Sequence, residues 1–271
     1  MGILKKEVFV FVLSILCFYQ SVNAQFNTEK FNIFSTHVKD SFEVYISTPK
    51  TYTANKIYDV VYYLDANIKS GKALRRFIQL TTNYNNLNQK IFVGIGHIGN
   101  FHKLRPRDFL IPSLPKNDIH NLYEKQCSIN NFYSFLTQNI IPLINLKFNT
   151  NTTNNSLIGH SFGGHFAFYC LFKNNNYFKH FYALSPSLWV NNYGIYKFIA
   201  TYTIFTTPKT LLFINGNLEF LNKIIVGNKQ MFQFLNGKKY PNLNYYYKTE
   251  TFSNHNTALT KSLKTILAAI K

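Results

Sequence analysis

The sequence predicts an α/β fold built on a mostly parallel central sheet, and three observations support this. β-Prone runs alternate with helix-compatible segments along most of the chain. The runs at 58–64 and 91–96 are continuous, as in parallel strands that are covered on both faces. The 271 residues contain no internal repeat and no linker, so we expect residues 25–271 to form one domain with helices on both faces of the sheet.

The elements follow in a simple order. Residues 31–38 and 41–48 alternate between apolar and polar side chains, which predicts an antiparallel N-terminal hairpin. The remaining strands are expected at 58–64, 91–96, 156–158, 181–185, 210–214 and 244–249. Helices are expected at 70–80, 131–145, 162–173 and 257–270, and Pro142 should end or kink the second of these. Segment 98–128 contains three prolines and is expected to be an irregular loop of a length that usually has a function.

Residues 1–24 have the features of a secretory signal peptide. Lys5 and Lys6 precede an apolar stretch at 8–19, and Val22-Asn23-Ala24 offers a cleavage site. The apolar stretch is shorter than the ~20 residues that span a bilayer. We therefore expect export to the periplasm or the medium without a stable membrane anchor, with an uncleaved anchor as the alternative. Cys127 and Cys170 could pair in an oxidising compartment or stay thiols.

Composition excludes several classes of protein. Hydrophobic residues make up 46% of the chain and aromatic residues 17%, which is too many for a disordered protein. Lys and Arg total 29 against 11 Asp and Glu, for a formal charge of +18. The basic residues are scattered singly and accompany no nucleic-acid-binding motif, so they indicate a basic surface and no nucleic-acid partner. Cys and His do not cluster at zinc spacing, so no metal site is expected.

The most informative motif is Gly159-His160-Ser161-Phe162-Gly163, which fits G-x-S-x-G. It lies between an apolar strand and an apolar helix, the context of a nucleophile elbow. In such a turn the neighbours of the serine must be small, and the hydroxyl stands at a helix N-terminus that favours developing negative charge. Ser161 is therefore the candidate nucleophile.

Three histidines follow Ser161, and one of them is the candidate base. His165 lies one helical turn beyond the nucleophile and faces the wrong way, and His180 begins a strand at the opposite edge of the sheet. His255 lies between the last strand and the last helix, where the order nucleophile, acid, base places the histidine. We expect His255 to accept the serine proton and His160 to be a packing residue.

Only two carboxylates follow Ser161, so the candidate acid is Glu219 or Glu250. Glu219 follows the next-to-last strand, which is the expected position of the acid, whereas Glu250 lies at the end of the last strand, five residues before His255. We favour Glu219. Glu250, or a Ser–His dyad without a close acid, are the alternatives.

An oxyanion formed at Ser161 needs two backbone N–H donors. One is expected from Phe162, directly after the nucleophile. The other is expected from Ala66 or Asn67, in the loop after the strand at 58–64, with Asp65 anchoring that turn.

These residues resemble the family named Putative esterase, a branch of the α/β-hydrolases with siderophore esterases, feruloyl esterases and S-formylglutathione hydrolases. The resemblance runs from about residue 30 to the end of the chain, and GHSFGG together with SPSLW is its most specific part. The segments that carry it are 63–65, 93–96, Arg105, 107–109, 141–142, 159–164, 185–189, 216–219 and His255.

The resemblance implies an α/β-hydrolase fold, no cofactor and a small-molecule or glycan-linked ester as substrate. It also implies that Arg105 lies near the substrate, with Tyr63, Ser187 and Trp189 as further pocket residues. Three positions depart from the family pattern, since Ala66 replaces a glycine, Val190 a second tryptophan and Asn254 a glycine before the histidine. These departures lie around the expected substrate pocket and one of the expected oxyanion donors.

The sequence thus predicts an exported serine esterase that forms an acyl-enzyme. Its substrate is expected to be a siderophore trilactone or a feruloyl or acetyl ester. A protein of the same fold that binds a siderophore or glycan without cleaving it is one alternative, and an acyltransferase is another. The oligomeric state does not follow from the sequence.

Overall fold

The computed structural model describes residues 25–80, 85–112, 127–173, 176–201, 204–219 and 223–270. The expected signal peptide at 1–24 and much of the expected loop at 98–128 lie outside the described residues. Among the helices that are described, none is long and apolar enough to cross a membrane.

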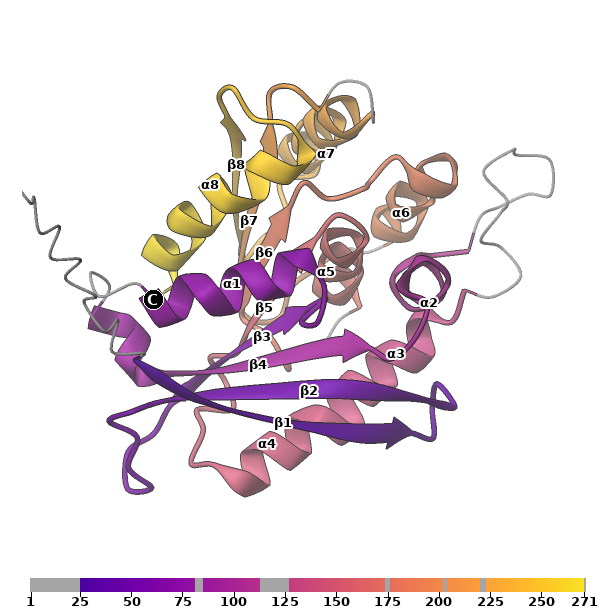
Figure 1. Ribbon diagram of the computed structural model, residues 1–271. Coiled ribbons are helices and arrows are strands. Elements are labelled where there is room, and N and C mark those ends of the chain that lie inside the picture. Colours follow the sequence, from indigo (N-terminus) through magenta and orange to yellow (C-terminus); the bar gives the residue numbers. More distant parts are fainter. Residues whose placement is uncertain are drawn as a thin grey trace, which may run out of the picture.

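An eight-stranded sheet in the order β1-β2-β4-β3-β5-β6-β7-β8 forms the centre of the described chain (Figure 1). β2 runs antiparallel to both β1 and β4, and all other neighbours are parallel. The strands are β1 Phe26–Ser35, β2 Asp40–Pro49, β3 Asp59–Leu64, β4 Lys90–His97, β5 Ser156–His160, β6 His180–Leu184, β7 Lys209–Gly216 and β8 Leu243–Glu250. The predicted hairpin and mostly parallel sheet are confirmed, and the topology is that of the α/β-hydrolase fold.

Alternation along β3 shows how the sheet is covered on both faces. Val60 and Tyr62 belong to one apolar cluster, whereas Val61 belongs to the other. Helices α1 and α8 cover the face of Val61, and α2 to α7 lie on the other side (Figure 1). The helices are α1 Lys69–Leu80, α2 Phe101–Phe109, α3 Ile129–Phe135, α4 Ile141–Lys147, α5 Phe162–Phe172, α6 Val190–Ala200, α7 Ile224–Lys238 and α8 His255–Ala269.

One prediction about helices was wrong, and one of the two outcomes expected at Pro142 is excluded. The segment predicted as an irregular loop contains α2, which includes Pro106 and is capped at its start by the Asn100 side chain. Pro142 does not end the helix that contains it, because a π-helical turn at Leu136–Ile140 precedes it and α4 continues to Lys147. Such a turn widens the backbone locally, so the proline ring and its missing N–H group fit without a break.

The pattern of the sequence also did not reveal α6 and α7. In α6 the residues Asn191, Asn192 and Tyr193 have φ values of 53°, 49° and 58°, so its start is interrupted by left-handed backbone. Helical periodicity is lost across such an interruption.

Parallel strands bring their carboxyl ends to one edge of the sheet, and the residues of interest follow those ends. Asp65 follows β3, Ser161 follows β5, Ser185 follows β6 and His255 lies a few residues beyond β8. Residues that are far apart in the chain therefore meet at one place, as ligand sites do in α/β folds generally.

Candidate active site

Ser161 occupies a sharp turn between β5 and α5. Its φ of 60° and ψ of −115° are strained for a residue with a side chain. The turn is held because the Ser161 N–H group donates to the carbonyl of Leu184, 2.8 Å away. A Cβ atom on Gly159 would overlap the carbonyl oxygen of Gly163, so the backbone can pass this closely only at glycine. The motif therefore forms the nucleophile elbow that its spacing predicts.

His255 faces the carboxylate of Glu219. The distance from His255 Nδ1 to Glu219 Oε2 is 3.6 Å, somewhat longer than a hydrogen bond. Glu219 is 1% exposed, and its other oxygen accepts from the Ser185 hydroxyl at 2.7 Å and from the Gly216 N–H group at 3.1 Å. The carboxylate is thus fixed from behind and turned toward the imidazole.

Glu250, the alternative acid, is engaged elsewhere. Its Oε1 atom lies 2.9 Å from Lys248 Nζ and accepts a hydrogen bond from Thr265 at 3.1 Å. Among the described residues, Glu219 is the carboxylate that lies within 4.0 Å of His255.

His255 begins α8, and the capping box of Asn254 and Thr257 fixes the start of that helix. The His160 ring lies against the His255 ring in a tilted arrangement, with centroids 4.6 Å apart and planes at 34° to each other. Burial, followed by the neighbouring His255, holds the pKa of His160 well below its ordinary value. His160 thus presents an uncharged face to His255 near neutral pH.

One cleft of about 160 Å³ is lined by Ser161, His255, His160 and Arg105. The Ser187 hydroxyl lies 3.3 Å from the Ser161 hydroxyl, so the predicted pocket residue Ser187 is next to the candidate nucleophile. The candidate nucleophile and the candidate base, which are 94 positions apart in the chain, meet at this cleft.

The loop after β3 supplies a candidate oxyanion donor, but it is not Ala66. The Ala66 N–H group donates to the Ile95 carbonyl at 3.0 Å, so the expectation that it binds an oxyanion was wrong. Asn67 is the remaining candidate in this loop, and its side chain donates to the His97 carbonyl at 2.6 Å. Phe162, the expected second donor, is the first residue of α5, where backbone N–H groups point out of the helix end.

Arg105 reaches this loop from α2. Its Nε and Nη2 atoms donate to the two carboxylate oxygens of Asp65 at 2.7 and 2.8 Å, and Nη2 also reaches the His160 carbonyl at 3.3 Å. Asp65 therefore does anchor its turn, and Arg105 is the partner that the sequence alone did not indicate.

Two other predicted pocket residues lie away from the cleft. Tyr63 is 1% exposed in the core, with its ring across Gly94, so the prediction that it contacts substrate was wrong. Strand alternation in β3 turns its side chain away from the cleft and into the cluster under α1 and α8. Trp189 is half-buried at the start of α6 and does not line the cleft.

His165 and His180 do not serve this cleft. His165 is fully buried, donates from Nδ1 to the Ser187 carbonyl at 3.1 Å and accepts from the Ile111 N–H group at 3.4 Å. Burial lowers the pKa of His165 to about 4, so it is a neutral packing residue. His180 begins β6, at the far end of the sheet, and contacts Asn154 at 3.1 Å.

Residues 35–212, more than half of the chain, match the model of the family described as Putative esterase. The chain belongs to this family.

Individual esterase relatives agree with this assignment. The chain is 26% identical over 191 residues to the ferri-bacillibactin esterase BesA of Bacillus subtilis, covering 66% of this chain and 66% of that protein. It is 30% identical over 118 residues to a siderophore enterobactin esterase of Emericella nidulans, covering 40% and 37% of the two chains. The alignments thus span just under two thirds of the first relative and about a third of the second.

A solved structure shows the same fold. The crystal structure of BES protein from Bacillus cereus superposes with a TM-score of 0.77 at 23% identity, covering 90% of this chain and 96% of that chain. This likeness extends over most of the chain.

Sequence reasoning about this esterase-family site missed Ser185. Its hydroxyl holds Glu219, and its φ of 42° places it in a strained turn directly after β6. Ser185 belongs to the SPSLW segment, so the resemblance pointed to the region but only Ser187 and Trp189 were singled out within it.

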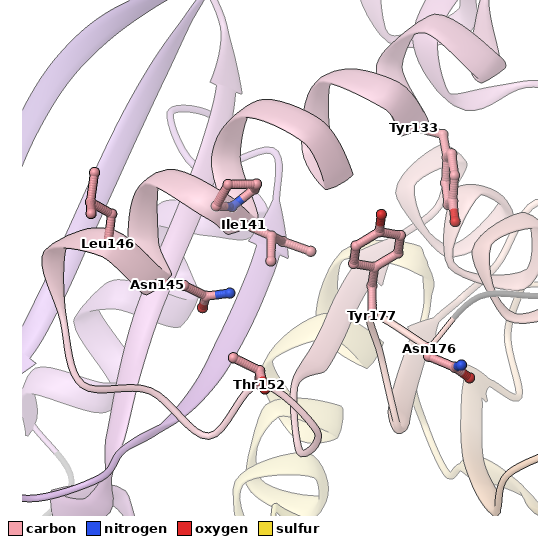
Figure 2. Close-up of a pocket in the computed structure, with 8 residues that line it drawn as sticks. Tyr133, Ile141, Asn145, Leu146, Thr152, Asn176 and Tyr177 are labelled. Atoms are coloured by element: carbon pink, nitrogen blue, oxygen red, sulfur yellow. The ribbon is translucent and has the colours of Figure 1, made fainter.

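A second, larger cavity of about 840 Å³ lies elsewhere, between α3, α4 and the loops that carry Thr152 and Tyr177 (Figure 2). None of the candidate catalytic residues lines it. Within the described residues, no group of three or more His, Cys, Asp or Glu side chains could hold a metal ion, and Cys127 and Cys170 are not joined in a disulfide.

Proposed function

We propose that this chain hydrolyses a carboxylic ester with Ser161 as nucleophile, His255 as base and Glu219 as the acid that orients the histidine. The observation that carries the proposal is the convergence of a strained elbow serine and a carboxylate-facing histidine at one cleft. Membership of the esterase family and the names of the two relatives support the same reaction.

The geometry suggests how each step proceeds. His255 Nδ1 faces Glu219, so Nε2 is the nitrogen that takes the proton from Ser161 as the hydroxyl attacks the ester carbonyl. The N–H groups of Phe162 and Asn67 hold the developing oxyanion. The alcohol leaves with the proton from His255, and water activated by the same nitrogen then releases the acid from the acyl-enzyme.

Replacement of the nucleophile tests the proposal directly. Ser161→Ala should reduce hydrolysis of a neutral short-chain p-nitrophenyl ester by about 10⁴-fold or more, because the remaining groups act only with the serine. Circular dichroism should show an unchanged fold. A fluorophosphonate should label wild-type protein at Ser161 and leave the variant unlabelled. Hydrolysis at the wild-type rate in the variant would exclude Ser161 as nucleophile.

For the substrate, we propose an anionic siderophore-type ester. Both curated relatives are named for siderophore or ferri-siderophore esters, and the chain carries a formal charge of +18, which attracts anions. Export directed by residues 1–24 fits such a substrate. N-terminal sequencing of the secreted protein tests this export, and the first residue is expected to be Gln25.

A further inference from the structure

An oxyanion hole works only when its two donors keep a fixed separation. In this chain the donors would come from Asn67, in the loop after β3, and from Phe162, at the start of α5. The loop is firmly held, because the Ala66 N–H group binds Ile95, the Ala66 carbonyl accepts from Arg75, and the Asn67 side chain binds His97. These bonds fix the loop to its own side of the sheet, but they do not tie it to the elbow.

The Arg105–Asp65 pair makes that tie. Asp65 immediately precedes the donor loop, is 1% exposed and has a φ of 61°, a strained value that needs outside support. Arg105 binds both carboxylate oxygens of Asp65 and, through Nη2, also the carbonyl of His160, the residue before the nucleophile. One guanidinium therefore joins the start of one donor segment to the elbow that carries the other.

Further contacts keep Arg105 in place. Its guanidinium carbon lies 5.4 Å from the centre of the Phe162 ring and 5.9 Å from that of Phe109, and its side chain is only 13% exposed. The carboxylate of Asp65 lies so close to Gly163 that a Cβ atom there would touch it. The planar fork of arginine can make these contacts together, whereas the single nitrogen of lysine cannot.

We propose that Arg105 is a positioning residue that sets the separation of the two oxyanion donors by bridging Asp65 and the His160 carbonyl. This proposal rests on the proposed ester hydrolysis at Ser161. It goes beyond a contact with the substrate, because two of the three nitrogens of Arg105 are already used inside the protein.

The test separates positioning from substrate binding by using a neutral ester, which offers no anion to Arg105. We expect kcat for p-nitrophenyl acetate to fall by about 10- to 100-fold in each of the variants Arg105→Lys, Arg105→Gln and Asp65→Asn. This fall in kcat is no larger than the one expected when a whole oxyanion donor is removed. KM should change by less than about twofold. Rates are counted per active site, titrated with a neutral fluorophosphonate, so that a loss of folded protein does not lower the apparent kcat.

A double variant adds a second, independent criterion. If Arg105 and Asp65 act through the same bridge, Arg105→Lys combined with Asp65→Asn should lose little more kcat than the worse single variant. Arg107→Lys is the matched control, since Arg107 lies on the same helix and forms a similar pair with Asp108, at 2.8 Å, without contacting the donor loop. Its kcat should stay within about twofold of wild type.

Two outcomes would overturn the proposal. If Arg105→Lys and Arg105→Gln keep the wild-type kcat for the neutral ester and only raise KM for an anionic ester, Arg105 binds substrate and does not position the donors. Additive losses in the double variant would likewise exclude a shared bridge.

Failure of the proposed function would look different, because wild-type protein would then hydrolyse no ester. The rate at which the neutral fluorophosphonate labels Ser161 still reports the donors in that case, since its P=O oxygen also needs them. Slower labelling of Arg105→Lys than of wild type or Arg107→Lys supports positioning, and equal labelling excludes it.

Discussion

At the scale of single residues, the structure distinguishes two carboxylates that the sequence left as alternatives. Glu219 is buried, held by Ser185 and Gly216, and turned toward His255. Glu250 lies between Lys248 and Thr265. The difference arises from loops of only a few residues after β7 and β8, and side-chain directions in such loops cannot be derived from spacing.

A pair of matched substitutions tests this distinction. Glu219→Gln should lower kcat for a neutral ester by about 10²- to 10⁴-fold, because the uncharged amide neither holds the histidine tautomer nor stabilises the imidazolium. Glu250→Gln, the same chemical change on the neighbouring strand, should leave kcat within about twofold. Equal losses in both variants, measured by steady-state kinetics, would contradict the assignment of Glu219.

The remaining residue assignments show where sequence reasoning works and where it does not. Motif and chain order were enough to predict that Ser161 and His255 lie at one cleft, because the elbow has strict steric demands and the fold fixes the order of its loops. Ala66 and Tyr63 were misplaced. Whether the Ala66 amide is already bonded depends on where β4 lies in space, and the face to which Tyr63 points depends on the register of β3.

At the scale of elements, the tight approach of β5 to α5 determines the elbow. The sequence predicted both elements to within two residues, because one is an apolar run and the other follows a glycine-rich turn. It did not predict α6 or α7, whose patterns are interrupted or weak, nor α2, whose proline suggested a loop. Local pattern therefore predicts the buried, parallel part of this fold better than its outer helices.

Two glycine substitutions test the elbow as an element. In Gly159→Ala the new methyl group meets the backbone of α5 at Gly163, which cannot move aside. Unfolding should cost about 1–3 kcal/mol less free energy, and fluorophosphonate labelling of Ser161 should be lost. Gly237→Ala in α7 is the control, since no atom lies within 4 Å of the position. It should raise stability by up to about 1 kcal/mol with labelling unchanged, as measured by urea unfolding.

At the scale of the whole molecule, the charge imbalance has a structural counterpart. Each described carboxylate lies within 4.0 Å of a lysine, arginine or histidine nitrogen. Apart from Glu219, which faces a histidine, each described carboxylate is thus paired with a lysine or an arginine, and the many remaining cations give the molecule a positive field. The overall fold class and the position of the site could be predicted from the sequence, whereas this pairing could not.

Salt dependence tests whether that field serves the reaction. Raising the salt concentration from about 20 mM to about 500 mM should lower kcat/KM for an anionic catecholate ester by about tenfold, because screening removes long-range attraction. For p-nitrophenyl acetate the change should stay below about twofold. Equal salt dependence for both esters would show that the positive charge does not select the substrate.

The position of Trp189 has a practical consequence. It is the only tryptophan in the chain, and it lies two residues after Ser187, whose hydroxyl is 3.3 Å from that of Ser161. Its half-buried indole is the one tryptophan fluorophore of the chain, and it lies close in sequence to the cleft although it does not line it. The tryptophan fluorescence of unlabelled protein therefore comes from Trp189 alone. Changes in this fluorescence can be used to follow ligand binding and acylation in real time without an attached dye.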